Sequence, residues 1–517
     1  MAEQNIAKRW IITITVILAS LLELIDTTIV NVALTDIMGN LGATLTDVGW
    51  VVTGYAVANV IVLPMSGWLS MRFGRKNYFM ASIVLFTVAS FLCGNSDTLL
   101  ELTLFRILQG LAGGGLLSTS QSILLETWPR EEAGMAMALF GVGAVFGPTI
   151  GPTIGGYITD HYSWPWIFYV NIPMGILAVS SVMLFITETP RQGKGNPIDW
   201  WGIILLAVSI GSLQIVLEKG ETEDWFETAY ISILTLTAII AGISFVWREA
   251  TIDHPIVNLS ILRHRSFSIG MFTSFVLGFG MYSSVFAFPI LCQSILGFTA
   301  EQTGELMIPG GLVTICIMPI TGMMLKKGVP AQIISTGGFI LFFVFTYMLS
   351  LTNGVAGEGD FFWPMIVRGV GMAILFVPLT TLAIQDLRGN EIGQGSGLNN
   401  MMRQLGGSFG IAISTTILDH RADFHRKILV EYINPYSQAF QQRFNMLVQG
   451  FKTKGFSLLE AQDMSTKAMN GIVTKQAMIL SYNDIFWLVG LFMLCCIPLV
   501  FMQKFNKKVD ISAADVH

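Results

Sequence analysis

The apolar run WIITITVILASLLELIDTTIVNVAL, residues 10–34, decides the fold of this chain. A helix needs about 20 mostly apolar residues to cross the roughly 30 Å of hydrocarbon in a bilayer. This run is long enough to do so, and it is too long for the apolar part of a cleavable signal peptide. It also contains two acids, Glu23 and Asp26. We therefore interpret it as a first membrane-spanning helix.

The rest of the 517-residue chain has the same character. Hydrophobic residues make up 53% of it and charged residues only 12%, about half the charged share of a soluble protein. This composition excludes a soluble enzyme and a disordered chain. The net charge of −5 offers no basic excess for nucleic acid. The five cysteines form no CxxC or Cys/His cluster, so we expect no metal, disulfide framework or cofactor.

Fourteen apolar runs are long enough to span a membrane, which predicts an all-α, polytopic membrane protein. The weakest of them is 200–217, which is short and precedes an acidic loop. The predicted spans are 10–34, 46–69, 78–96, 98–120, 133–157, 165–186, 200–217, 229–247, 267–291, 303–325, 331–351, 361–384, 396–418 and 481–503.

Lys and Arg gather in every second connection between these runs, as in 72–76, 263–265 and 326–327, whereas the alternate short loops contain only Lys219. Basic residues favour the cytoplasmic side of a membrane. With an even number of spans, this bias predicts that both chain ends are cytoplasmic.

The spans group as six, two and six. We expect an N-terminal bundle over 1–190, two extra linker helices over 191–262, and a C-terminal bundle over 263–517. The basic turns GWLSMRFGRK (67–76) and GMMLKKGVP (322–330) occupy equivalent places in the two halves. Two related halves with a site between them are typical of transporters.

The second half contains a long outside loop, 419–480. After Pro435 its apolar residues fall on one helical face. These residues are Phe440, Phe444, Leu447, Val448 and Phe451. The face suggests either a helical cap over the outer mouth or a docking surface for a partner protein.

Charged residues at bilayer depth are costly and are functional candidates by default. Glu23, Asp26, Arg106 and Arg368 qualify, and Arg403 lies nearer the inner end of its span. Asp26 and Arg106 both lie about eight residues from the outer ends of their helices, or roughly 12 Å deep. Equal depth permits an ion pair.

A carboxyl held between desolvation and a nearby Arg can change protonation with small movements, as proton coupling requires. Glu23 shares a helix face with Asp26, so the two acids can relay a proton. We predict proton coupling at Asp26, Glu23 and Arg106. The alternative for each acid is a fixed structural contact, and Arg368 has an equally good interpretation in helix packing.

Uncharged polar residues also interrupt the apolar runs. Each either lines a substrate cavity or forms an interhelical hydrogen bond. They are Asn31, Tyr55, Asn59, Gln109, Gln121, Gln214, Tyr282, Gln293, Asn399 and Asn400.

Two segments suggest conformational gating. The fifth span, GVGAVFGPTIGPTIGGYI (141–158), repeats glycine every four residues. This pattern indicates close helix packing, and the prolines add the possibility of a hinge. The turn at 67–76 suggests a latch on the inner face. The candidate gating residues are Gly67, Arg72, Gly74, Arg75, Gly147, Pro148, Gly151, Pro152, Gly155 and Gly156.

These segments together resemble the major facilitator superfamily. GWLSMRFGRK resembles its motif after the second helix, with Met71 in place of the usual Asp. LTLFRILQGLAGG (102–114) is similar to its fourth-helix motif, and GPTIGPTIGG (147–156) to its antiporter motif. ELIDTTIVNVAL (23–34), SWPWIFYVNIPMG (163–175), RGVGMAILFVPLTTLA (368–383) and GLNNMMRQLGGSFGIA (397–412) resemble segments of fourteen-helix drug:proton antiporters, closest to the EmrB type.

The resemblance implies a proton-driven exporter of hydrophobic or amphiphilic compounds in the inner membrane. It further implies a periplasmic membrane-fusion adaptor and an outer-membrane channel as partners. A dedicated exporter of one metabolite, fatty acid or siderophore is the alternative. A membrane enzyme or receptor is disfavoured, because the six histidines lie in loops or the tail and the two tails are too short for an output domain.

Overall fold

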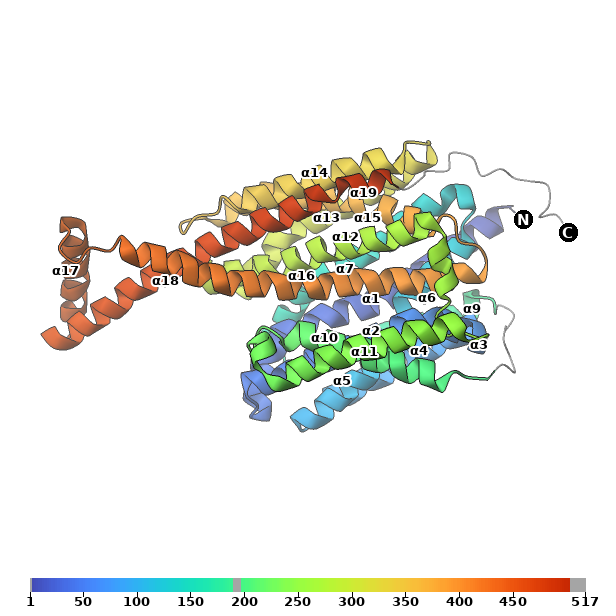
Figure 1. Ribbon diagram of the computed structural model, residues 1–517, viewed down its shortest axis with the longest axis horizontal. Helices are drawn as coiled ribbons and strands as arrows, with labels where there is room; N and C mark the ends of the chain where they lie inside the picture. Colours follow the sequence, from blue (N-terminus) through green and yellow to red (C-terminus); the bar gives the residue numbers. More distant parts are fainter. Residues whose placement is uncertain (1, 189–196, 503–517) are drawn as a thin grey trace.

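The protein is a long bundle of helices, seen here in a computed structural model that describes residues 2–188 and 197–502 (Figure 1). Within these ranges every regular element is a helix. Thirteen helical stretches are long and apolar enough to cross a membrane. The chain is therefore a multi-pass membrane protein, as its composition predicts.

The helices up to residue 188 belong to the first six spans. They are α1 (Ala2–Leu41), α2 (Leu45–Val62), η1 (Leu63–Met65), α3 (Ser66–Phe73), α4 (Arg75–Gly94), α5 (Leu99–Gly113), α6 (Leu116–Thr127), η2 (Arg130–Glu132), α7 (Ala133–His161), α8 (Trp166–Tyr169) and α9 (Asn171–Phe185).

The later helices comprise the middle pair and the second half. They are α10 (Trp200–Lys219), η3 (Trp225–Glu227), α11 (Ala229–Thr251), η4 (Leu259–Arg263), α12 (Arg265–Ile290), η5 (Leu291–Leu296), α13 (Ala300–Lys326), α14 (Ala331–Leu349), α15 (Glu358–Ile384), α16 (Asn390–Glu431), α17 (Gln438–Thr453), α18 (Leu458–Cys495) and α19 (Ile497–Phe501).

Helix α16 completes the fourteen-helix arrangement. It is 42 residues long and packs along α12 and α18 inside the bundle. Its segment NEIGQGSGLNNMMRQLGGSFG is rich in Gly, Asn and Gln, which explains why it falls short of the apolarity of the other thirteen. The weakest span is therefore α16 rather than 200–217, where α10 is a regular and strongly apolar helix.

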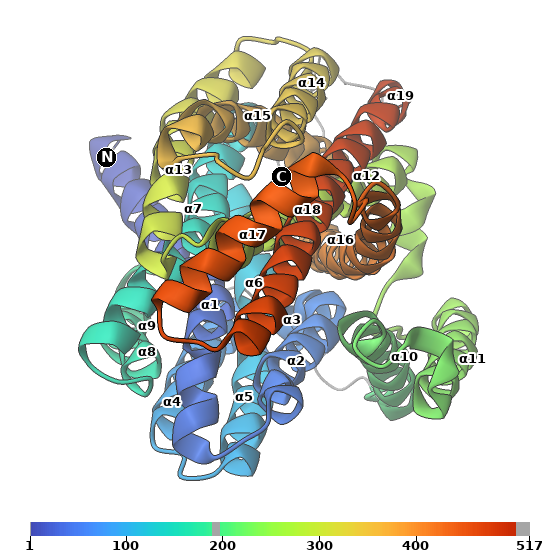
Figure 2. The ribbon, with the colours of Figure 1, turned by 90° about the vertical axis from the view of Figure 1, so that its left-hand side faces the viewer.

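The extra helices α10 and α11 lie side by side at the flank of the bundle (Figure 2). Arg248 of α11 forms an ion pair of 2.6 Å with Asp199, which caps the start of α10. Burial raises the pKa of Asp199, but the hydrogen bonds from Arg248 and from the backbone N–H of Gly202 outweigh it and keep that pKa below its usual value. Helix α10 contacts α2 of the first half and α16 of the second.

The two halves meet closely at the end of the bundle that contains α3, α19 and the start of α1 (Figure 1). There α16 packs against η1, α3 and α6. A side chain on Gly67 would lie 2.6 Å from the backbone of Gln394, and one on Gly397 would lie 2.5 Å from the carbonyl oxygen of Leu63. Glycine at both positions permits this backbone contact.

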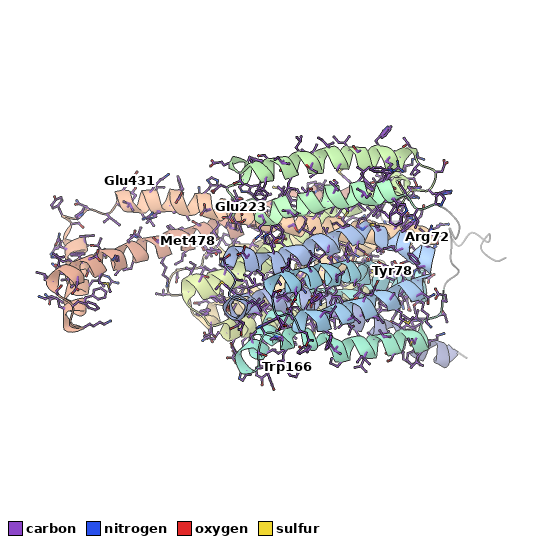
Figure 3. All side chains as sticks on the ribbon, turned by 90° about the horizontal axis from the view of Figure 1, so that it is seen from below. Arg72, Tyr78, Trp166, Glu223, Glu431 and Met478 are labelled. Carbon is purple, nitrogen blue, oxygen red and sulfur yellow. The ribbon has the colours of Figure 1, made fainter. Side chains whose placement is uncertain are left out.

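The segment 419–480 is a helical protrusion rather than a loop with one helix. Residues 419–431 continue α16, residues from 458 belong to α18, and α17 lies across the far end (Figures 1 and 3). The helix predicted after Pro435 is therefore present. Its apolar face packs against α18 with Val448 buried, so that face is not an open docking surface. Helix α17 stands away from the bundle instead of closing it.

Helix α7 packs on α1 through its glycine repeat. A side chain on Gly147 would meet Leu24, one on Gly151 would meet Thr28, and one on Gly155 would lie 2.8 Å from the carbonyl oxygen of Ile29. The packing interpretation of this repeat is therefore confirmed. Helix α7 is continuous through Pro148 and Pro152, and their role as a hinge stays a prediction.

Adjacent glycines of α7 give a matched test of this packing. Gly155→Ala forces its methyl group against the backbone of Ile29, and overpacking of this kind costs about 1–3 kcal/mol. In Gly156→Ala the new methyl group meets only Val32 at 3.8 Å, and helix propensity favours Ala by about 1 kcal/mol. We expect Gly155→Ala to lower the melting temperature of the purified protein in detergent. Equal melting temperatures for the two variants would contradict the packing argument.

Candidate functional site

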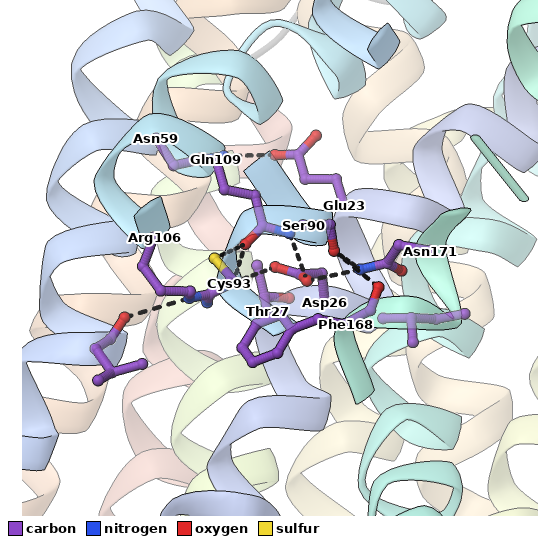
Figure 4. Close-up of polar contacts among 12 residues, drawn as sticks. Glu23, Asp26, Thr27, Asn59, Ser90, Cys93, Arg106, Gln109, Phe168 and Asn171 are labelled. Carbon is purple, nitrogen blue, oxygen red and sulfur yellow. Dashed lines mark hydrogen bonds and ion pairs between the residues drawn. The ribbon is translucent and has the colours of Figure 1, made fainter. Parts of the chain in front are cut away.

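Asp26 is the centre of a buried polar network in the first half (Figure 4). Its side chain is fully buried, and one carboxylate oxygen accepts a 2.5 Å hydrogen bond from Nη1 of Arg106. The other oxygen accepts from Nε2 of Gln109 at 2.8 Å and from Nδ2 of Asn171 at 2.9 Å. The equal depth predicted for Asp26 and Arg106 is thus realised as a direct ion pair between α1 and α5.

The Arg106 guanidinium is also fully enclosed. Its centre lies 4.1 Å from the ring centroid of Tyr55 and 5.7 Å from that of Phe168. Its Nε donates to the carbonyl oxygen of Val51 at 3.3 Å, and Nη1 also donates to Gln109 at 2.7 Å. Aromatic faces and carbonyl groups thus replace the water that a guanidinium would otherwise require.

Asn171 and Ser90 are members of this network that the sequence analysis did not identify. Asn171 Nδ2 donates to Ser90 Oγ at 3.0 Å as well as to Asp26, and Ser90 donates to the carbonyl oxygen of Phe168 at 2.9 Å. Asn171 is a polar residue inside the apolar segment SWPWIFYVNIPMG, and this position could have identified it as a candidate.

Glu23 occupies a separate environment on the same helix. One of its carboxylate oxygens accepts from Nδ2 of Asn59 at 2.8 Å, and the other accepts from the backbone N–H of Leu117 at 3.2 Å. Leu117 lies in the first turn of α6, where unpaired N–H groups favour a negative charge. Glu23 and Asp26 therefore have different hydrogen-bond partners, and a proton relay between them stays a prediction.

Some of the predicted cavity residues join the two halves. Asn400 of α16 donates from Nδ2 to Ser118 and Gln121 of α6, each at 3.2 Å. Its neighbour Asn399 accepts a hydrogen bond of 2.6 Å from the Ser274 hydroxyl within the second half. Asn400 and Gln121 therefore bond across the boundary where a transporter of this architecture would hold its substrate.

The other polar candidates are dispersed. Tyr282 is half-buried against Gly407, and Arg368 is buried without an ion-pair partner among the described residues. Gln214 donates to Glu218 and to Ser408 of α16. The exposed candidates are Asn31 and Gln293. None of these residues joins the hydrogen-bonded networks of Asp26, Glu23 or Asn400, and Gln214 links α10 to α16 separately.

The turn at 67–76, predicted as a latch, makes several contacts with its surroundings. Gly74 has a φ of +87° and separates α3 from α4, as predicted. Arg75 forms an ion pair with Glu126 at the end of α6, and Arg72 stacks on Trp68. Beside the Gly67–Gln394 contact, an ionic link between the halves at this end involves residues that were not predicted: Glu132 of η2 binds Arg9 at 3.0 Å and Lys326 of α13 at 2.8 Å.

A polytopic helical bundle with two packed halves and a charged network buried in one of them defines a membrane transport protein. The family model of the Major Facilitator Superfamily matches residues 16–411. The chain therefore belongs to the major facilitator superfamily.

Similar proteins extend over nearly the whole chain. The multidrug export protein EmrB of Escherichia coli K12 is 34% identical over 96% of this chain and 95% of that protein. The fatty acid resistance protein FarB of Neisseria gonorrhoeae is 33% identical over 96% of both. The crystal structure of the human organic anion transporter MFSD10 shares the fold, with a TM-score of 0.58, 14% identity, and coverage of 94% of this chain and 99% of that one.

The Asp26–Arg106 pair makes a testable contribution to stability. Asp26→Asn leaves Arg106 buried without its counter-charge, and breaking such a pair costs about 3–5 kcal/mol. Replacing both partners, as Asp26→Asn with Arg106→Met, removes the uncompensated charge. We expect the double variant to unfold at a higher temperature than Asp26→Asn alone. Strictly additive losses in this double-mutant cycle would contradict a direct interaction.

Proposed function

We propose that this protein is a proton-coupled multidrug efflux transporter, an antiporter that exports hydrophobic or amphiphilic compounds across the cell inner membrane. The buried Asp26–Arg106 pair carries the proposal, because ionisable residues at membrane depth are costly and mark proton or substrate pathways. The similarity to multidrug export proteins over nearly the full length supports it.

In this proposal the proton binds at Asp26. Protonation removes the charge that holds Arg106 and weakens the contacts that join α1 to α5 and α9. Inward movement of one positive charge supplies about 2.3 kcal/mol per 100 mV of membrane potential. Glu23 and Arg106 complete the coupling group, and the hydrogen bond from Asn59 connects Glu23 to α2.

The gating part of the proposal places the closed end of the bundle on the cytoplasmic side, together with both chain ends. The basic residues of the inner turns support this orientation. The six-two-six division into 1–190, 191–262 and 263–517 then lets the halves rock about the α7–α13 contact. Release of the Glu132–Lys326 pair and of the Gly67–Gln394 contact opens the cytoplasmic end.

The protrusion formed by the ends of α16 and α18 and by α17 is the proposed binding surface for a periplasmic adaptor, which would connect the transporter to an outer-membrane channel. It projects from the end opposite the closed one (Figure 3). Tyr432, Tyr436 and Leu459 expose 83%, 93% and 79% of their surface there. Exposed aromatic residues are common anchors in protein interfaces.

Proton coupling predicts a sharp phenotype for Asp26→Asn. In proteoliposomes with an imposed pH gradient, we expect this variant to lose gradient-driven transport of a fluorescent dye. Asp36→Asn, which removes an exposed acid from the same helix, serves as the matched control and should transport normally. Dye transport by Asp26→Asn at the wild-type rate would refute the coupling assignment.

The breadth of substrates separates the proposal from its alternative, a dedicated exporter of one metabolite, fatty acid or siderophore. The similarity to a fatty acid resistance protein supports this alternative. We expect a strain lacking the gene to become sensitive to several unrelated hydrophobic compounds, and the cloned gene to restore resistance. Sensitivity to a single compound class would support the dedicated exporter instead.

A further inference from the structure

Arg403 is a further buried cation, at the boundary between the halves, and the coupling network does not use it. It exposes only 5% of its surface, and its Nη1 has no hydrogen-bond partner. No carboxylate lies within ion-pair distance of Arg403 in the part of the chain that the structure describes. Its guanidinium centre lies 5.2 Å from the ring centroid of Phe376 on α15.

The charged and titratable groups that interact with Arg403 are few. Glu23 of α1, in the first half, interacts with it electrostatically. The Tyr282 hydroxyl of α12, in the second half, does so as well. Both oxygens of Glu23 already accept hydrogen bonds, from Asn59 and from the backbone of Leu117. Arg403 therefore lies at the boundary with the N–H groups of its Nη1 atom unused.

Other buried polar atoms without hydrogen-bond partners lie on the same helix as Arg403. Ser396, Asn399 and Asn400 lie one to two turns before Arg403 on the same face of α16, and each has a buried side-chain atom without a partner. Buried polar groups are nearly always hydrogen-bonded, so free donors and acceptors gathered on one buried helix face suit a polar ligand group.

We propose that Arg403 binds the anionic end of the transported substrate, and that the transporter prefers amphiphilic organic anions, such as long-chain carboxylates, to cations. This inference rests on the proposed transport function and specifies its substrate class. A guanidinium binds a carboxylate through two parallel hydrogen bonds, and the pair is strong where water is excluded. The buried ring of Phe376 lies against the guanidinium, and the half-buried ring of Tyr282 offers apolar surface for the body of the same molecule.

A binding experiment without any proton gradient tests this site. The wild-type protein in nanodiscs is titrated with 11-(dansylamino)undecanoate and with the uncharged primary amide of the same compound. We expect the acid to bind about tenfold more tightly or better, as for a charge-assisted hydrogen bond. Unlabelled dodecanoate should displace the probe, and dodecyltrimethylammonium should not.

Three variants assign the preference to Arg403. Arg403→Gln should lose the preference for the acid while binding the amide as wild type does. Arg403→Lys should retain part of it, because the charge remains but the paired geometry does not. Arg130→Gln removes an exposed cation elsewhere and should bind both probes normally.

The outcomes are distinct. Equal binding of acid and amide by the wild type, or a preference for dodecyltrimethylammonium, overturns the proposal even if Arg403→Gln does not fold. A folded Arg403→Gln protein that keeps the acid preference overturns it as well. Selective binding of the acid without gradient-driven export would leave this site intact and would instead count against the proposed transport function.

Discussion

The structure depends on the cost of placing charge at lipid depth. Asp26 and Arg106 are both fully enclosed, and neither is tolerable there without the other. Their contact fixes α1 against α5, and the hydrogen bonds of Asp26 to Gln109 and Asn171 extend the constraint to α9. The glycine repeat of α7 then allows that helix to pack directly on α1 beside the pair. The arrangement of the first half thus follows from one electrostatic requirement together with the close packing that surrounds it.

The two halves satisfy this requirement differently. Arg106 and Arg368 each lie in the fourth predicted span of their half, 98–120 and 361–384, yet only Arg106 has an acid beside it. Arg403 is likewise without an ion-pair partner among the described residues. The first half thus contains a charged network whose members satisfy one another, whereas the second presents cations with unused donors. This difference is the physical basis for our proposal that proton chemistry belongs to one half and substrate recognition to the other.

The sequence predicted those parts of the molecule that follow from depth and periodicity. Counting residues from the helix ends brought Asp26 and Arg106 together, and the spacing of glycines anticipated the packing of α7. The partners of Glu23 were not predictable, because one of them is a backbone N–H group of α6 that leaves no mark in the residue types. Asn171 was overlooked inside an apolar motif. The polar composition of α16 concealed how far that helix extends beyond the predicted span 396–418. The buried position of Arg403 depends on how α16 packs against its neighbours, which residue spacing alone does not give.

The length of α16 has a mechanical consequence. One uninterrupted helix, Asn390–Glu431, contains the contact with Gly67 near its start, Arg403 within the bundle, and the base of the protrusion at its end. At 1.5 Å per residue it measures about 63 Å. In the proposed rocking motion it would act as a lever arm, since a tilt of a few degrees at one end of a rigid helix displaces the other end by several ångströms. A partner protein bound at that end would be displaced in every transport cycle by the movement of α16 itself, without any separate signalling element.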